Sequence, residues 1–438
     1  MNRLTLLLIV MISVNASTAQ WFPLSSGTMR NLNDIFFTNA NTGYAVGDSG
    51  TILKTADGGA NWDTLSCGTY YNLNAIDFPE FNTGYAVGAG MNENSRYEGI
   101  ILKTNDAGIN WNASYVSYPD AEASISDVSF PDITTGYLAG AKVSGPIPFP
   151  PSWLFIKKTN DGGSTWSYSF EGAGWQGGGW HPSSICFTDS NTGYLAGLVG
   201  HNSGTGGRIG KSTDGGVTWE FSGSELPALN SIFFTDFSTG YVVGCEGEIL
   251  KTIDGGTNWI SQYSGTSNHL NAVYFPTDDI GYIAGEGIVQ KTIDGGTNWM
   301  QLSGGDTFFL NAVFFTSADT GYAVGYDGTI LKTTNGGGLP VGIIESAVSS
   351  SQFAVRIYPN PTSGIVNLQF TVYNLESVSL KIYNAQGQEV AVVLDEKLPA
   401  GEHTVRWDAE ALPAGIYYYR LTTDDRRMTT YTGKIVKY

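Results

Sequence analysis

Basic residues are scarce in this 438-residue chain. Its 22 Lys and Arg stand against 40 Asp and Glu, which gives a formal net charge of −18. Seven lysines of residues 20–343 belong to a repeated motif, and the remaining bases there are Arg30, Arg96, Lys142, Lys157 and Arg208. A surface with that charge repels phosphate backbones, so we expect no nucleic-acid partner.

Cysteine and long apolar runs are also scarce. The three cysteines, Cys67, Cys186 and Cys245, share no spacing, which excludes a disulfide framework and leaves room for at most one bridge. The apolar run at residues 4–14 is too short for a membrane span. Because it follows Arg3 and precedes small residues, it predicts a secretory signal peptide over residues 1–19. We therefore expect a secreted or surface-displayed protein.

Helical periodicity is absent, and an internal repeat replaces it. The phrase KTIDGGTNW occurs unchanged at residues 251–259 and 291–299, and looser copies begin at Lys54, Lys103, Lys158, Lys211 and Lys332. Each unit of about forty residues holds four short β-rich runs separated by Gly, Asn and Asp turns, which is typical of a propeller blade. The sequence predicts an all-β protein with a seven-bladed β-propeller over residues 20–338.

The ends of the repeat predict how the ring closes. The seventh copy stops at Gly338 without its tryptophan, whereas Trp21 stands before the first copy without a preceding turn. We therefore expect the strand at residues 21–24 to complete the seventh blade.

The acid of each repeated phrase fits a turn. An Asp side chain can accept hydrogen bonds from the backbone of its own turn, and the two glycines that follow permit unusual backbone angles. The tryptophan three residues after the glycines supplies an apolar face between blades. We expect structural roles for Asp57, Asp106, Asp161, Asp214, Asp254 and Asp294, with Asn335 in the seventh copy.

These units resemble the Asp-box, or bacterial neuraminidase, repeats. The pairing of F-x-x-x-x-T-G-Y-A-V-G with I-L-K-T-x-D-G-G-x-x-W is most similar to the repeats of photosystem II stability and assembly factors, over roughly residues 21–338. The resemblance implies the propeller fold but little about function, because sialidases and xyloglucan-cleaving endoglucanases share such repeats. A sialidase needs an arginine cluster, and the propeller has only Arg30, Arg96 and Arg208. The arginine-rich patch of the assembly factors also has no counterpart here.

A different domain follows the repeats. After a linker at residues 339–352, alternating apolar strands with Gly, Pro and Asn turns predict a small Ig-like β-sandwich over residues 353–438. Its motifs resemble the C-terminal sorting domain (type A) of type IX secretion cargo: Tyr358-Pro359-Asn360-Pro361, Gly364, Tyr383-Asn384, Gly387, Leu412-Pro413 and Gly415-Ile416-Tyr417. The resemblance implies export across the outer membrane, with the type IX secretion machinery as a partner.

Insertions into the repeat indicate where a ligand site lies. Additions at residues 89–99, 141–154, 171–182 and 198–207 all fall in loops that share one face of a propeller, opposite the Asp-box turns. They hold the three tryptophans that belong to neither the repeat nor the C-terminal domain. The candidate ligand-binding residues are Trp153, Trp175, Trp180, His181, Tyr97 and His201. Their exposed rings suit a glycan or a protein ligand, and the structural alternative is that they pack the long loops.

Several acids are expected on the same face. These are Asp48, Glu246, Glu286 and Asp327 in short turns, and Glu93, Glu98 and Glu171 in the additions. Two of them at a suitable separation could hydrolyse a glycosidic bond or hold Ca²⁺, although solubility is the plainer explanation. We expect a monomeric ligand-binding propeller without catalytic residues, metal or cofactor. A glycoside hydrolase is the alternative, and two facing carboxylates beside Trp175 and Trp180 would favour it. An assembly-factor-like scaffold is a second alternative, based on fold analogy alone.

Overall fold

The computed structural model describes residues 21–143, 152–172, 179–201, 204–302, 307–338, 356–358, 362–372, 376–384, 388–423 and 430–437. The predicted signal peptide and the predicted linker lie outside these residues. The chain divides into two compact units, Met1–Ile344 and Glu345–Tyr438. No helix in the described part of the chain is long and apolar enough to cross a membrane.

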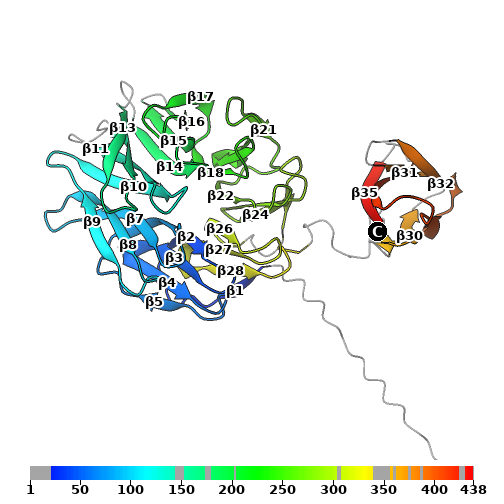
Figure 1. Ribbon diagram of the computed structural model, residues 1–438, viewed down its shortest axis with the longest axis horizontal. Helices are drawn as coiled ribbons and strands as arrows, with labels where there is room; N and C mark the ends of the chain where they lie inside the picture. Colours follow the sequence, from blue (N-terminus) through cyan, green and yellow to red (C-terminus); the bar gives the residue numbers. More distant parts are fainter. Residues whose placement is uncertain are drawn as a thin grey trace, which may run out of the picture. The chain divides into compact units, whose positions relative to one another are not determined.

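The first unit is a ring of seven four-stranded antiparallel sheets, which confirms the predicted seven-bladed propeller (Figure 1). Blades are numbered along the chain, from blade one (β2–β5) to blade seven. The inner strands are β2 (Leu32–Phe37), β6 (Asn72–Asp77), β10 (Glu122–Ser129), β14 (Trp180–Phe187), β18 (Leu229–Phe234), β22 (Leu270–Tyr274) and β26 (Leu310–Phe315). The second strands are β3 (Gly43–Gly47), β7 (Gly84–Met91), β11 (Gly136–Val143), β15 (Gly193–His201), β19 (Gly240–Gly244), β23 (Gly281–Gly285) and β27 (Gly321–Gly325).

The third strands are β4 (Thr51–Thr55), β8 (Tyr97–Thr104), β12 (Ser152–Thr159), β16 (Gly204–Ser212), β20 (Ile249–Thr252), β24 (Ile288–Thr292) and β28 (Ile330–Thr333). The outer strands are β5 (Asp63–Leu65), β9 (Asn112–Val116), β13 (Ser167–Gly172), β17 (Glu220–Leu226), β21 (Ile260–Gln262), β25 (Met300–Gln301) and, from the other end of the chain, β1 (Phe22–Leu24). Short 3₁₀ turns join the second and third strands at η1 (Asp48–Gly50), η2 (Cys245–Gly247) and η3 (Tyr326–Gly328).

The ring closes with the N-terminal strand. β1 pairs with β28, from Phe22 opposite Lys332 to Leu24 opposite Ile330, and completes the sheet of β26, β27 and β28. In Figure 1 the blue β1 lies beside the yellow β28. The prediction that residues 21–24 seal the seventh blade is therefore confirmed.

Each Asp-box turn is held by its own acid. The Asp57 carboxylate accepts hydrogen bonds from the backbone N–H of Asn61 at 2.9 Å and from its side-chain amide at 2.7 Å. The Thr55 hydroxyl donates to it at 2.9 Å and accepts the N–H of Gly59 at 2.8 Å. These hydrogen bonds lower the pKa of Asp57 to about 2. Gly59 has a φ of 82°, which a side chain would oppose. Asp106, Asp161, Asp214, Asp254 and Asp294 repeat the pattern.

The repeated lysine and tyrosine join each blade to the next. Lys332 and Tyr322 of blade seven both donate to the carbonyl oxygen of Gly58 in blade one, at 2.6 and 2.7 Å. The lysine ammonium also lies 5.3 Å from the centre of the Tyr322 ring. Each tyrosine ring stacks on an inner-strand phenylalanine, as Tyr322 does on Phe37 at 4.1 Å. In five repeats the lysine and the tyrosine share one carbonyl of the next blade in this way, which gives the lysine of those repeats a structural role that the sequence did not indicate.

The second unit consists of two antiparallel sheets around one apolar core. One sheet holds β29 (Arg356–Tyr358), β30 (Ile365–Val372) and β33 (Gly401–Asp408), and the other holds β32 (Glu389–Leu398), β31 (Glu376–Asn384), β34 (Gly415–Thr423) and β35 (Thr430–Lys437). Leu368, Phe370, Leu380 and Trp407 are among the buried side chains that fill the core. This arrangement agrees with the small β-sandwich that the sequence predicts.

Candidate functional site

The hairpin between the second and third strands is longer in blades two, three and four than in the other blades. In blade one the second and third strands pair from Gly43 opposite Thr55 to Gly47 opposite Thr51. In blade two the corresponding pairing continues to Met91 opposite Tyr97, and blades three and four have similarly long pairings. The additions therefore extend hairpins on the face opposite the Asp-box turns.

A group of six side chains lies on the side of blade three that faces blade two. We call it the aromatic–lysine cluster; it consists of Tyr118, Lys142, Trp153, Lys157, Tyr168 and Glu171. Tyr118 comes from the loop before β10, and the other five come from β11, β12 and β13. Alternation along β12 places Trp153 and Lys157 on the same side as the buried Phe155, whose ring contacts Tyr118 and Tyr168.

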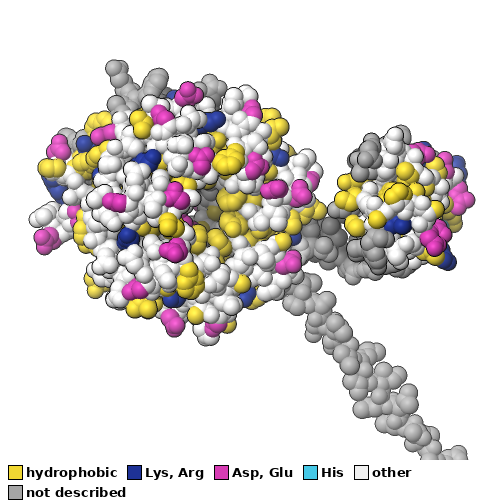
Figure 2. Space-filling view, viewed as in Figure 1, with side chains coloured by type: hydrophobic (Ala, Val, Ile, Leu, Met, Phe, Trp, Pro, Cys, Tyr) yellow, Lys and Arg dark blue, Asp and Glu magenta, His cyan; other side chains and the backbone are white. Residues whose placement is uncertain are grey.

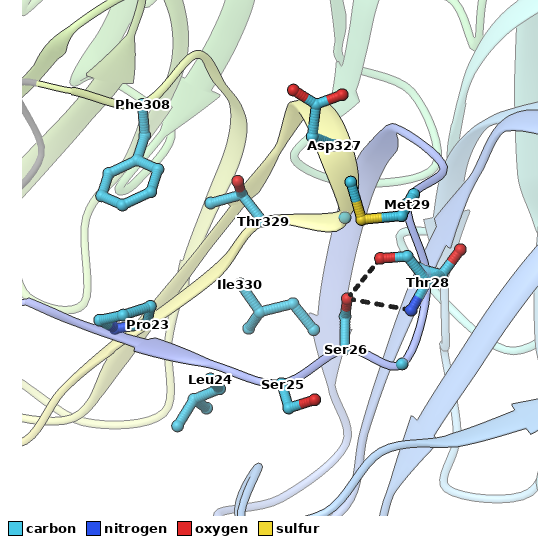
Figure 3. Close-up of a pocket in the computed structure, with 12 residues that line it drawn as sticks. Pro23, Leu24, Ser25, Ser26, Thr28, Met29, Phe308, Asp327, Thr329 and Ile330 are labelled. Atoms are coloured by element: carbon cyan, nitrogen blue, oxygen red, sulfur yellow. Dashed lines mark hydrogen bonds between the residues drawn. The ribbon is translucent and has the colours of Figure 1, made fainter.

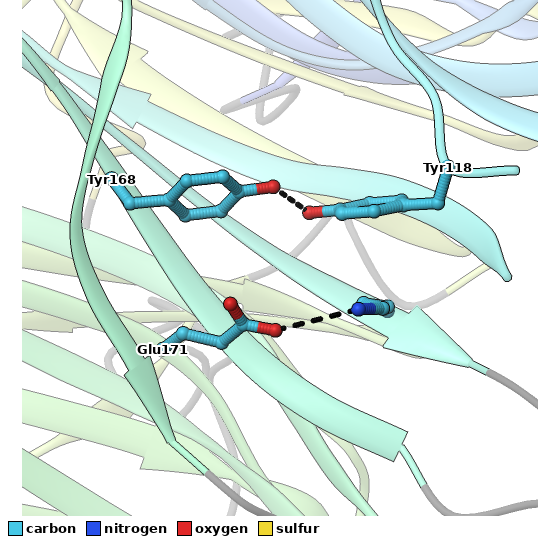
Figure 4. Close-up of polar contacts among 4 residues, drawn as sticks. Tyr118, Tyr168 and Glu171 are labelled. Atoms are coloured by element: carbon cyan, nitrogen blue, oxygen red, sulfur yellow. Dashed lines mark hydrogen bonds and ion pairs between the residues drawn. The ribbon is translucent and has the colours of Figure 1, made fainter. Parts of the chain in front are cut away.

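Lys142 contacts three other members of this cluster. Its ammonium lies 4.6 Å from the centre of the Tyr118 ring, 5.9 Å from that of Trp153 and 3.5 Å from the Glu171 carboxylate. Figure 4 shows this ion pair and the hydrogen bond between the hydroxyls of Tyr118 and Tyr168. The Glu171 side chain is 43% exposed and the Tyr168 residue 44% exposed, so the cluster is open to a ligand.

Lys157 replaces an apolar residue of the repeat. It pairs with Tyr168 across the sheet, where blade one pairs Leu53 with Thr64 and blade two pairs Leu102 with Ala113. Its ammonium lies 4.0 Å from the centre of the Tyr168 ring, and burial lowers the pKa of the amine. Burial, followed by the hydroxyl contact, raises the pKa of Tyr118, so this phenol stays neutral.

The structure separates the predicted ligand-binding residues. Trp153 belongs to the aromatic–lysine cluster, and alternation with Gly99 places Tyr97 on the side of blade two that faces blade three. His181 lies on the opposite side of blade three, where its Nε2 is 3.3 Å from the Ser152 hydroxyl and desolvation lowers its pKa. Trp175 lies outside the described residues. Only the backbone of Trp180 and His201 is described, in β14 and β15.

Sequence reasoning missed four members of the cluster. Tyr118 and Tyr168 lie outside the additions, and Lys142 and Lys157 were noted only as bases outside the repeat. The sequence did contain one indication of the cluster, which is Lys157. Four other blades have a leucine at this position: Leu53, Leu102, Leu250 and Leu331.

Several of the predicted surface acids have partners. Asp48 accepts from the side-chain amides of Asn31 and Asn33, at 3.0 and 3.1 Å. Glu98 accepts from the Tyr71 hydroxyl at 2.8 Å, and Glu171 pairs with Lys142. Within the described residues, no group of three or more His, Cys, Asp or Glu side chains is arranged to hold a metal ion.

The inner strands line a central channel with two unlike walls. Each inner strand has a partly exposed residue between two buried ones, at the position that Phe36 occupies in the blade-one motif Leu32–Phe37. It is aromatic in blades five, six, seven and one, where neighbouring rings lie 4.8 to 5.2 Å apart, and polar in the other three. Hydrophobic side chains gather beside the central hollow in Figure 2, over β22 and β26. These residues are Phe233, Tyr274, Phe314 and Phe36 on one wall, and Asp77, Ser129 and Cys186 on the other.

Three carboxyl groups in the channel connect blades one to four, because each accepts a hydrogen bond from the backbone of the next blade. Asp34 accepts the N–H of Ile76 in blade two at 2.9 Å, and Asp77 accepts that of Phe130 in blade three at 2.8 Å. Asp127 likewise accepts the N–H of Ile185 in blade four. Burial raises the pKa of Asp34, Asp77 and Asp127 to about 8, 7 and 6. These acids satisfy inner-edge N–H groups that would otherwise lack a partner.

A pocket of about 460 Å³ lies where β1 meets blade seven (Figure 3). Pro23 and Phe308 stand on one side of it and Thr28 and Met29 on the other, with Ile330 between them. Met29 is 77% exposed, and the Asp327 carboxylate stands at the edge. The pocket contains none of the predicted ligand-binding residues.

Two family models match the chain. The model for the photosynthesis system II assembly factor YCF48 matches residues 13–117 and 224–308, and the secretion system C-terminal sorting domain matches residues 356–437. Within the propeller, the first match omits residues 118–223, which include blade three and most of blade four, and residues 309–338, which include the strands β26 to β28 of blade seven. No curated protein sequence matches the chain.

Solved structures with the same fold include YCF48 bound to a D1 peptide, at 20% identity and a TM-score of 0.53, covering 72% of this chain and 97% of that one. YCF48 from Cyanidioschyzon merolae is 18% identical, with a TM-score of 0.53 and coverage of 72% and 98%. The GH74 enzyme of Niastella koreensis is 14% identical, with a TM-score of 0.53 and coverage of 95% and 74%. At these identities the likeness shows the fold. The chain therefore joins a β-propeller with repeats of the photosystem II assembly factor type to a secretion system C-terminal sorting domain, which indicates type IX export to the cell surface or beyond it.

Proposed function

We propose that the exported propeller binds an extracellular polysaccharide through the aromatic–lysine cluster. The observation that carries the proposal is the grouping of Tyr118, Trp153 and Tyr168 around Lys142 and Glu171. Aromatic rings offer apolar faces to a sugar, and the ammonium and carboxylate supply hydrogen-bond donors and acceptors. A few polar groups beside apolar faces are the usual composition of a site that orients a small polar ligand.

The position of the cluster supports the same function. Five of its six residues lie on β11, β12 and β13 of blade three, so the sheet holds Trp153 and Tyr168, and Tyr118 reaches them from the loop before β10. A binding surface on a rigid scaffold is a common use of propeller insertions. Binding without catalysis fits the acids best, because Glu98 and Glu171 already have hydrogen-bond or ion-pair partners.

The experiment described below also distinguishes two other candidate functions. A solved neighbour is described as bound to a peptide, which makes a protein ligand the second candidate. A glycoside hydrolase is the third, since a GH74 enzyme shares the fold and the acids of this face lie near the cluster.

The experiment applies the full chain to immobilised polysaccharides and measures both retention and release of reducing ends. We expect retention without sugar release, and about a tenfold loss of affinity in Trp153→Ala and in Tyr168→Ala. Tyr263→Ala is the matched control, because that tyrosine is 89% exposed in a loop away from the cluster. Sugar release would establish the hydrolase, and absence of retention on every polysaccharide would turn the search to a protein ligand.

A further inference from the structure

Resting on the glycan-binding function proposed above, we infer that the ligand is an anionic polysaccharide, whose acidic groups pair with Lys142 and Lys157. The shared chemistry is a sugar bearing a carboxylate or a sulfate ester. The site is the aromatic–lysine cluster already defined.

The first support is the location of the few bases that do not belong to the repeated lysine position. Only Arg30, Arg96, Lys142, Lys157 and Arg208 of the propeller segment fall outside the repeated lysine position. Two of these five are in the cluster. Arg96 reaches its edge, where a guanidinium N–H donates to the carbonyl oxygen of Pro119, next to Tyr118. A protein with a net charge of −18 thus concentrates its spare positive charge beside three aromatic rings.

The second support is that Lys157 departs from the repeat at an energetic cost. Four other blades bury leucine at this position, and leucine would fill the space between the blades without desolvating a charge. The half-buried ammonium lies over the Tyr168 ring, where the protein supplies no carboxylate within ion-pair distance among the described residues. An amine in that position can pair with an anion that arrives on the exposed face of Tyr168.

The third support is the loose ion pair of Lys142. Its 3.5 Å distance to Glu171 leaves ammonium donors available, and 43% of the Glu171 side chain is exposed to solvent. A ligand carboxylate or sulfate can therefore join Glu171 at this ammonium or replace it. Both ammonium groups lie over tyrosine rings, so a sugar bound at the cluster brings its acidic groups close to both amines.

Pairs of probes that differ only in charge test the inference. Polygalacturonate is compared with its fully methyl-esterified form, and dextran sulfate with dextran, by affinity for the full chain. We expect the charged member of at least one pair to bind about tenfold more tightly, and the pair that shows it identifies carboxylate or sulfate as the recognised group. Lys142→Met and Lys157→Met each keep the aliphatic stem and remove the charge. Each should lower affinity for the anionic probe about threefold to fivefold more than it lowers affinity for the neutral partner of the pair.

Arg30→Met is the matched control, because Arg30 is an exposed base on the same face in blade one, away from the cluster. Equal binding of charged and neutral probes, with both lysine variants unchanged, would overturn the anionic ligand while leaving glycan binding intact. Failure of every probe, neutral and charged, to bind would overturn both proposals. A loss in Arg30→Met as large as in the lysine variants would assign the effect to general charge and overturn the site.

Discussion

Blades five, six, seven and one differ from blades two, three and four although all seven share one frame. The first group has short turns between the second and third strands and an aromatic channel wall. The second group has long hairpins and a polar channel wall, and it includes most of the propeller residues that the assembly-factor model leaves unmatched. The departures thus gather in adjacent blades, where a single ligand can contact them together.

The difference separates positions that the frame requires from positions that it leaves free. Inner-strand phenylalanines, box glycines and the Tyr–Lys pairs occur on both sides of the ring, because each satisfies packing or hydrogen bonds between neighbouring blades. Channel positions and hairpin lengths vary, since they face water or the open face. A ligand site can change at these positions without loss of the propeller.

The shared frame predicts equal costs for matched core deletions. Phe130 in blade three and Phe275 in blade six stack on a tyrosine at 4.0 and 3.9 Å and meet a tryptophan edge-on at 5.8 and 5.9 Å. We expect Phe130→Ala and Phe275→Ala each to lower the free energy of unfolding by about 3–5 kcal/mol, measured by urea denaturation. A difference above about 2 kcal/mol between them would show that the two groups of blades do not share one frame.

The three carboxyl groups that connect the first blades predict a loss of stability as pH rises from 5 to 8. The pKa values of Asp34, Asp77 and Asp127 are raised from 3.8, so the folded state binds their protons more tightly than the unfolded state does. Their contribution is complete below the unfolded pKa and is lost as pH rises through the folded values of about 6 to 8. We expect the free energy of unfolding to fall by at least about 1.4 kcal/mol between pH 5 and pH 8, which corresponds to one pKa unit.

The control for this pH effect comes from the chain itself. Ser129, Ser184 and Ser231 accept the same kind of inner-edge N–H group in other blades. Replacing the three aspartates by serine should therefore keep these hydrogen bonds and flatten the stability profile between pH 5 and pH 8. An unchanged profile would contradict the assignment. Box acids such as Asp57, with a pKa of about 2, titrate below this window.

The sequence predicted the frame because the frame repeats. Seven copies of one motif made the blade count, the turn acids and the closure by residues 21–24 readable from spacing alone. The aromatic–lysine cluster was only partly predictable, since Trp153 lies in an addition whereas Tyr118 and Tyr168 do not. Their meeting depends on strand alternation and on packing between two blades, which a one-dimensional pattern does not specify.

The channel acids were missed for a related reason. Asp34 and Asp127 occupy the same inner-strand position, but Asp77 lies two residues further along its strand, so no spacing relates all three. They approach one another only when the blades form a ring. Sequence periodicity indicates what one blade repeats, and contacts across the axis require the closed structure.

The smallest expected difference concerns the lysine contacts between blades. Lys332 donates to the Gly58 carbonyl at 2.6 Å, whereas Lys158 of blade three reaches the Gly215 carbonyl only at 3.5 Å. Both ammonium groups lie at similar distances from a tyrosine ring, 5.3 and 5.1 Å, so methionine substitution removes a similar cation–π contact from each. Lys332→Met should therefore cost about 1 kcal/mol more than Lys158→Met in the free energy of unfolding, because only Lys332 loses a short charged hydrogen bond. Equal costs in urea denaturation would mean that the contacts between blades three and four are as tight as the closure of the ring, and that the two groups of blades differ only where they face solvent.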